Sequence, residues 1–278
     1  MKRITFICLI SLVLYSFMNN KTNQDEIKFT EIKGKKHYYR LSGEGNPVVV
    51  FVSGLGPTMD DFFKIQNRIS KRNQTLCYDR AGIGNSEPMN NDRNLENISD
   101  ELKEFLNNVI PEKEFVIVAH SRGGLIARYF ANKNPEKLRG LLLIDSAIPE
   151  WKNKKRALRT ETEKVDFDKF YNSFCTDSSK YSATIRSEFK NSFENDSVLI
   201  ADKGFPTKIP VSMIVSSKVT KDKYSSKEME QKFDLVKSYL KSAPHIRLVF
   251  TNRSGHFIHE DEPKLVIKEI NFLLSKIR

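Results

Sequence analysis

The run around Ser121 constrains the fold of this chain more than any other segment. The apolar run Phe115–Ala119 ends shortly before it, Gly123 and Gly124 follow it, and a helical pattern begins at Leu125. A strand, a serine and a helix in this order are typical of a sharp turn that presents a nucleophile, and small neighbours relieve its strained backbone. Alanine stands where that pattern usually has its first glycine. A serine before a helix is also a common N-cap, so this run alone leaves both interpretations open.

Short apolar segments alternate with helical patterns along most of the chain. Helical patterns occupy residues 62–69, 102–109, 125–131 and 227–242, and another begins at Pro263. This alternation predicts an α/β fold, with a mostly parallel sheet and helices on both faces. The first two expected strands form a hairpin that turns at Gly34. The expected strands are Ile27–Thr30, His37–Leu41, Val48–Val52, Thr75–Tyr78, Phe115–Val118, Leu141–Ile144, Val211–Val215 and Ile246–Phe250.

The alternation breaks down between about residues 149 and 206. This segment mixes charged residues with phenylalanines, and we expect short helices inserted between two strands of the core. Its aromatic side chains either line an apolar pocket or pack within the insertion itself. These side chains are Trp151, Phe167, Phe170, Tyr171 and Phe174.

Residues 1–22 have the pattern of a targeting segment. Lys2 and Arg3 precede the apolar run Ile4–Met18, and a polar stretch follows. A positive start and a short apolar run indicate an export signal, because a membrane-spanning helix needs ~20 residues. No small-residue cleavage site is visible, so an uncleaved N-terminal anchor is the alternative. In either case we expect an exported protein, which is secreted, periplasmic or held on the outer face of a membrane.

The charge and the cysteines exclude several classes of protein. The net charge is +11 over 278 residues, but no zinc-finger, basic-helix or RNA-reading signature accompanies it, so we expect no nucleic-acid partner. Loose attraction to a membrane surface is compatible with this charge. Outside the N-terminal segment we expect two unpaired thiols, Cys77 and Cys175. His256 and His259 lie three residues apart with no third ligand in view, so we expect no metal and no cofactor.

Four loops follow expected strands, at the edge where open α/β sheets place their sites. In the first, residues 53–57, glycines allow a close backbone approach, and the N–H groups of Leu55 and Arg122 together suit a tetrahedral oxyanion. The second loop contains Asp79 and Arg80, which we interpret as ions of the scaffold. The third begins with Asp145, directly after an apolar strand, where a carboxylate requires a partner.

The fourth loop contains His256, after the last strand. The chain order of Ser121, Asp145 and His256 is the order of nucleophile, acid and base in one known class of triad. Agreement among the four loops is a stronger signal than any one of them.

These residues resemble the α/β-hydrolase superfamily, especially its esterase- and peptidase-like members. The resemblance rests on Tyr78–Ser86, on His120–Gly124 and on Gly255–Phe257, and it extends from about residue 27 to residue 278, excluding the insertion at 149–206. It implies that Ser121 is the nucleophile and His256 the general base. It also implies that residues 149–206 form a cap over the pocket.

The acid has two candidates. Many members of the superfamily carry it after the strand that corresponds to Val211–Val215, and there the first acid of this chain is Asp222. Others carry it one strand earlier, at Asp145. We prefer Asp145, because it directly ends a strand and is therefore held rigidly.

The sequence thus predicts a serine hydrolase of the carboxylesterase type. It would act through a Ser-His-Asp triad and an acyl-enzyme on a small or medium ester. Two alternatives remain at this stage: an amide or peptide hydrolase on the same triad, and a non-catalytic binding protein on the same scaffold. The expected partner is a small-molecule ester or amide, and the sequence does not indicate an oligomeric state.

Overall fold

The computed structural model describes residues 26–201, 204–219 and 226–277. The expected N-terminal signal or anchor, residues 1–22, and the alternative acid Asp222 lie outside the described residues. Among the described residues, no helix is long and apolar enough to cross a membrane. Cys77 and Cys175 are free thiols, as the sequence predicts.

Eight strands form one sheet. They are β1 (Ile27–Ile32), β2 (Lys35–Ser42), β3 (Val48–Val52), β4 (Thr75–Tyr78), β5 (Phe115–His120), β6 (Leu138–Ile144), β7 (Val211–Ser216) and β8 (Ile246–Thr251). Their order across the sheet is β1-β2-β4-β3-β5-β6-β7-β8. The β1–β2 hairpin and the β2–β4 pair are antiparallel, and the other neighbours are parallel. The prediction of a mostly parallel sheet is therefore confirmed.

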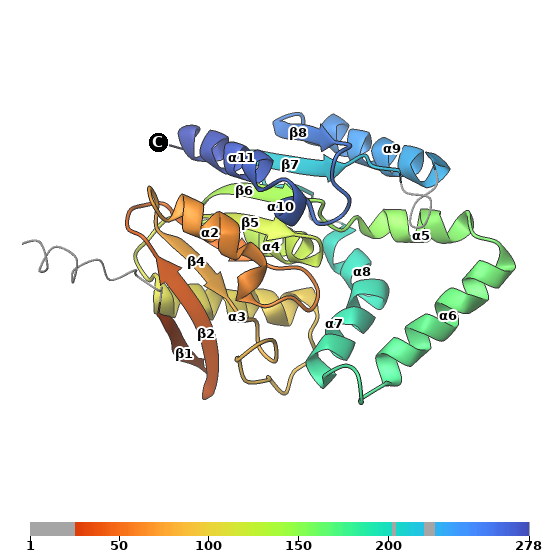
Figure 1. Ribbon diagram of the computed structural model, residues 1–278, viewed down its shortest axis with the longest axis horizontal. Helices are drawn as coiled ribbons and strands as arrows, with labels where there is room; N and C mark the ends of the chain where they lie inside the picture. Colours follow the sequence, from red (N-terminus) through yellow and green to blue (C-terminus); the bar gives the residue numbers. More distant parts are fainter. Residues whose placement is uncertain (1–25, 202–203, 220–225, 278) are drawn as a thin grey trace, which may run out of the picture.

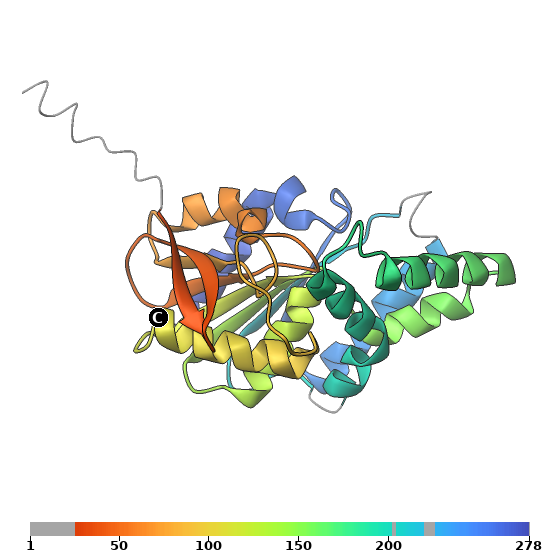
Figure 2. The same cartoon turned by 90° about the horizontal axis from the view of Figure 1, so that it is seen from below.

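Helices cover both faces of this sheet, which confirms the predicted α/β class. Figure 2 shows the orange helix α2 and the dark blue helix α11 above the sheet, and the yellow and yellow-green helices α3 and α4 below it. Outside the insertion the helices are η1 (Met59–Phe62), α2 (Phe63–Ile69), α3 (Leu95–Val109), α4 (Arg122–Lys133), α9 (Ser226–Ser242), α10 (Ile258–Asp261) and α11 (Pro263–Ser275).

The central strands are buried on both faces, so they are apolar at nearly every position. In β3, the side chains of Val49 and Phe51 pack with α2 and α11, whereas those of Val48, Val50 and Val52 pack with α3 and α4. This alternation follows from the period of two along a strand. The sheet therefore holds a hydrophobic core on each side, which makes it a rigid support for the loops at its carboxyl edge.

The segment between β6 and β7 forms helices, as the sequence predicts. They are α5 (Pro149–Ala157), α6 (Glu161–Thr176), α7 (Ala183–Glu194) and α8 (Asp196–Ala201). Figure 1 shows them beside the sheet, with α6 farthest from it. Because α5 follows closely after the carboxyl end of β6, the insertion lies at the edge of the sheet where the four loops gather.

Some element boundaries differ from the sequence-based expectation. The expected helix 62–69 is divided into η1 and α2, and α3 begins earlier, at Leu95. The side chain of Asn94 accepts a hydrogen bond from the Asn97 N–H and so caps α3 at that point. The short helix α10 lies within a segment that the sequence pattern presents as a loop.

Candidate active site

Ser121 occupies the turn between β5 and α4 with a strained backbone. Its φ is 52° and its ψ is −123°, in a region that residues other than glycine rarely adopt. Two hydrogen bonds hold the turn to the end of β6 and to the loop after it: the Ser121 N–H donates to the Ile144 carbonyl (3.1 Å), and the Ala147 N–H donates to the Ser121 carbonyl (3.0 Å). The side chain of Ser121 makes no capping hydrogen bond to α4. The N-cap interpretation of this serine is therefore wrong.

The glycines around Ser121 are required by close packing. A Cβ atom on Gly123 would lie 2.4 Å from the Val52 carbonyl oxygen, and one on Gly124 would lie 2.2 Å from Ser146 Oγ. On the other side of the turn, a Cβ on Gly54 would lie 3.2 Å from Ser121 Cβ. The loops after β3, β5 and β6 therefore meet at the serine.

The structure brings Ser121, His256 and Asp145 together. His256 Nε2 is 2.9 Å from Ser121 Oγ, and His256 Nδ1 is 2.8 Å from Asp145 Oδ2. When Nδ1–H donates to the carboxylate, Nε2 is left to accept the hydrogen bond of the serine hydroxyl. The imidazole is 32% exposed, whereas the carboxylate is 6% exposed. The histidine is thus open to a ligand while its partner is shielded from water.

Asp145 is held from several directions at the end of β6. Its backbone has a φ of 37°, and its Oδ1 accepts hydrogen bonds from the Ser216 N–H (3.0 Å) and from Lys232 Nζ (2.7 Å). Burial raises the pKa of the Asp145 carboxyl, but the hydrogen bond from His256 and the charge of Lys232 outweigh this effect and lower it. The group is therefore a carboxylate at neutral pH. The structure describes no part of the alternative acid Asp222.

Lys232 is a site residue that the sequence analysis missed. It belongs to α9, its side chain is 4% exposed, and its Nζ also donates to the Ser216 carbonyl (3.3 Å). A signal was present in the sequence. Lys232 comes three residues after Met229 and four residues before Val236, so it lies on the same apolar face of the helix as these two buried residues. A charged residue on the buried face of a helix requires a partner of opposite charge.

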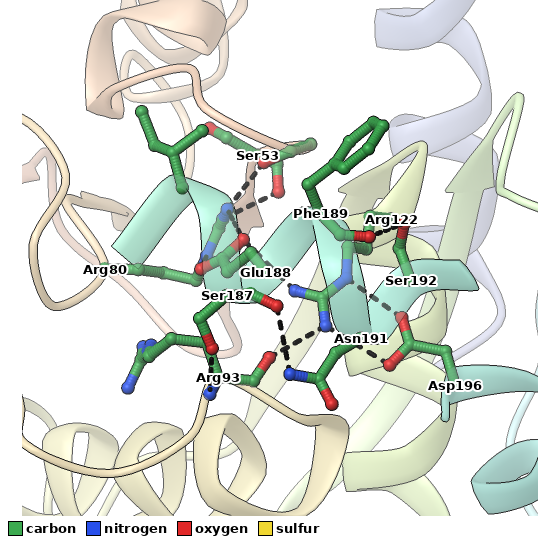
Figure 3. A network of polar contacts seen from close by, with 12 residues as sticks. Ser53, Arg80, Arg93, Arg122, Ser187, Glu188, Phe189, Asn191, Ser192 and Asp196 are labelled. Atoms are coloured by element: carbon green, nitrogen blue, oxygen red, sulfur yellow. Dashed lines mark hydrogen bonds and ion pairs between the residues drawn. The ribbon is translucent and has the colours of Figure 1, made fainter. Parts of the chain in front are cut away.

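The two expected oxyanion donors lie next to Ser121. Leu55 follows Gly54, which packs against the serine, and Arg122 is the first residue of α4. The Arg122 side chain is 3% exposed; its Nε donates to Asp196 Oδ2 (2.9 Å), and its Nη2 donates to the Arg93 carbonyl (2.9 Å). Figure 3 shows this guanidinium between α7 and α8 of the insertion. The sequence did not indicate either of these partners.

Asp79 and Arg80 belong to the scaffold, as the sequence analysis expected. Asp79 Oδ1 accepts a hydrogen bond from the Met59 N–H (2.7 Å), and Asp79 Oδ2 accepts one from the Asn85 N–H (3.0 Å). These bonds fix the loop after β4 against η1. Arg80 is buried beside the loop after β3, where it donates to the Ser53 carbonyl (2.8 Å).

A polar group of two histidines and an aspartate lies beneath His256. Possible ligand atoms of Asp61, His120 and His259 all lie within 4.8 Å of one another, and this is the only such group found among the described residues. His259 Nε2 is hydrogen-bonded to Asp61 Oδ1 (3.0 Å), and His120 Nε2 is hydrogen-bonded to the His256 carbonyl (2.9 Å). The residue types suit a transition-metal ion. The spacing of His256 and His259 did not reveal this group, because His120 and Asp61 come from other loops.

Comparison with known proteins agrees with this architecture. Residues 47–241 match the sequence profile of a family described as alpha/beta hydrolase fold. The chain is 26% identical over 162 residues to the uncharacterized protein YbdG of Bacillus subtilis, a match that covers 53% of this chain and 50% of YbdG. The chain thus spans about half the length of this curated relative.

Solved structures resemble the chain over most of its length. A thermophilic esterase from Thermogutta terrifontis superimposes with a TM-score of 0.61 at 19% identity, covering 90% of this chain and 97% of the esterase. The epoxide hydrolase VrEH1 from Vigna radiata superimposes with a TM-score of 0.69 at 16% identity, covering 92% of this chain and 100% of the epoxide hydrolase. At these identities the resemblance establishes a common fold.

Proposed function

The chain belongs to the alpha/beta hydrolase fold family, and from this premise we propose that it is a serine hydrolase acting on small or medium carboxylic esters. The observation that carries the proposal is the chain of hydrogen bonds from Ser121 through His256 to Asp145. A hydroxyl that donates to an imidazole, which is itself held by a buried carboxylate, has the arrangement of an activated nucleophile.

In the proposed reaction, Ser121 Oγ bonds to the acyl carbon while His256 Nε2 takes its proton. The imidazolium then gives this proton to the departing alcohol, which leaves an acyl-enzyme. Water next attacks the acyl carbon while the same imidazole takes a proton from it; the bond to Ser121 Oγ then breaks, the carboxylic acid leaves, and the imidazolium returns the proton to Oγ. Asp145 stays ionised and stabilises the imidazolium. The N–H groups of Leu55 and Arg122 stabilise the oxyanion, and the loss of one such donor typically costs ~3 kcal/mol.

The first test uses a fluorophosphonate probe together with a series of p-nitrophenyl esters and a matched p-nitroanilide. We expect the wild type to be labelled and to cleave short esters, and we expect Ser121→Ala to lose both properties. Ser238→Ala is the control, because Ser238 lies exposed on α9. Well-folded wild type with neither labelling nor turnover would instead support a binding protein, and faster cleavage of the anilide would support an amide hydrolase.

The identity of the acid is tested by two matched substitutions. Loss of the carboxylate that orients the imidazole is expected to lower kcat by ~10⁴-fold in Asp145→Asn, as in other triads. Asp222→Asn is expected to change kcat by less than ~3-fold, because Asp145 already binds the Nδ1 side of the imidazole. A large loss of kcat in Asp222→Asn together with a small loss in Asp145→Asn would identify Asp222 as the acid of the triad.

A further inference from the structure

A buried ion cluster joins the insertion to two of the loops around Ser121 (Figure 3). Arg80 follows β4, Arg122 begins α4, and Glu188 lies on α7. Their side chains are 2%, 3% and 0% exposed. Glu188 Oε2 is 3.0 Å from Arg80 Nη2 and 3.1 Å from Arg122 Nη1. A single carboxylate oxygen of the insertion therefore bridges two guanidiniums whose residues follow different strands of the sheet, β4 and β5.

Arg80 also binds the loop that carries Leu55. Its Nη1 donates to the Ser53 carbonyl (2.8 Å), and its Nη2 donates to the Gly54 carbonyl (2.6 Å). A trans peptide is planar, and its C=O and N–H point in opposite directions. The bond to the Gly54 carbonyl therefore also fixes the direction of the Leu55 N–H. A cationic donor on this carbonyl polarises the peptide and strengthens its N–H as a hydrogen-bond donor.

We propose that Arg80 and Glu188 are positioning residues that hold the N–H groups of Leu55 and Arg122 in a fixed relation to each other. The proposal rests on the proposed function, in which these two N–H groups bind the oxyanion. Glu188 orients the guanidinium of Arg80, which in turn aims the Leu55 peptide. Glu188 also pairs with the side chain of Arg122. The insertion thereby takes part in transition-state stabilisation without touching the substrate.

The charges in the cluster show which change will disturb it selectively. Burial raises the pKa of the Glu188 carboxyl, but the charges of Arg80 and Arg122 outweigh this effect and lower it, so Glu188 is ionised. Arg122 keeps a second carboxylate, because its Nε and Nη2 donate to Asp196 Oδ2 (2.9 Å) and Oδ1 (3.2 Å). Removing both Arg80 and Glu188 therefore leaves Arg122 paired and removes one charge of each sign.

The test compares the double variant Arg80→Met/Glu188→Met with the single variant Glu188→Gln. Replacing both partners of a buried ion pair by apolar residues of similar size leaves no unpaired charge, so the double variant is expected to fold even where Glu188→Gln does not. Glu269→Gln is the matched control, because Glu269 is another buried carboxylate, 1% exposed, and it pairs with Arg247 outside this cluster.

We expect the double variant to lower kcat for a p-nitrophenyl ester by ~10–100-fold and to change KM by less than ~3-fold, because the interaction is made in the transition state. Its affinity for phenylboronic acid, which forms a tetrahedral adduct with the serine, should fall by the same factor as kcat/KM. The control should match the wild type in both assays. A folded double variant with wild-type kcat and wild-type boronate affinity would overturn the proposal.

A second measurement does not depend on turnover. The ¹H–¹⁵N resonance of the Leu55 amide reports how this peptide is held, and we expect it to shift and broaden in the double variant but not in Glu269→Gln. If the wild type neither labels nor cleaves esters, the proposed function fails, and the Leu55 resonance still decides whether Arg80 and Glu188 hold the peptide. An unchanged resonance in the double variant would overturn the positioning role.

Discussion

His120 shows, at the scale of the single residue, how burial determines charge beneath the candidate site. His120 is 2% exposed, and the ring centroids of His256 and His259 lie 4.6 Å and 4.3 Å from that of His120. Burial first, and then the positive charges that His259 and His256 can carry, lower the pKa of His120 to about 3. His120 is therefore neutral at pH 7, and its Nε2–H donates to the backbone carbonyl of the proposed base.

Substitution of His120 by glutamine is expected to flatten the pH dependence of folding. Between pH 3 and the ordinary histidine pKa of 6.5, the unfolded chain binds a proton that folded His120 does not. Stability therefore falls as the pH falls through this window, by up to ~1.4 kcal/mol per pH unit. Urea denaturation from pH 6.5 to 4 should show a shallower fall for His120→Gln. The control is His245→Gln, at an exposed histidine, which should keep the wild-type dependence of the free energy of unfolding on pH. The same pH dependence in all three proteins would contradict this account.

The contact between α4 and β3 shows, at the scale of the element, how a single position sets the approach of a helix to a strand. Gly123 places the first turn of α4 directly against the backbone of Val52 and Ser53. Gly123→Ala is expected to lower the free energy of unfolding by ~1–3 kcal/mol, because the added methyl group overpacks this contact. Chemical denaturation measures the change. The control is Gly255→Ala, because an added Cβ at Gly255 would meet no atom within 4 Å, and we expect it to leave the free energy of unfolding almost unchanged. Equal losses of stability at the two glycines would show that α4 can move to accommodate the methyl group.

Local patterns predicted the elements well, and long-range partners poorly. The bounds of β3 match the prediction, and those of β7 and α9 differ from it by one residue, because a buried strand or an amphipathic helix has a period that can be read locally. The approach of Ser121, Asp145 and His256 follows from the rule that parallel strands end at one edge of the sheet. The ion pairs of Glu188 and Lys232 were missed, because their partners depend on which distant segment each helix meets.

At the scale of the whole molecule, the insertion is anchored unevenly. The buried cluster ties α7 and α8 to the sheet through Glu188 and Asp196. By contrast, no residue of α6 is buried, and Val165 and Phe170 are 50% and 52% exposed. The ring of Phe174 on α6 stacks on Phe189 of α7 at 3.9 Å, so α6 is held mainly through its neighbour (Figure 1). The stability of the insertion should therefore decrease from α7 to α6.

Native-state hydrogen exchange tests this division. Because local opening follows burial, we expect α6 amides to open at a free energy about 2–4 kcal/mol below that of β5, with α7 between the two. Thr160→Ala removes the cap of α6, where Thr160 Oγ1 accepts a hydrogen bond from the Glu163 N–H (3.3 Å), and should lower the opening free energy of α6 alone by ~1 kcal/mol. If Thr160→Ala lowers the opening free energies of α6 and α7 together, the insertion opens as one unit. Its opening would then disturb Glu188 and the Leu55 peptide as well. If only the opening free energy of α6 falls, α6 can open, for example to a ligand, while the buried ion cluster stays intact.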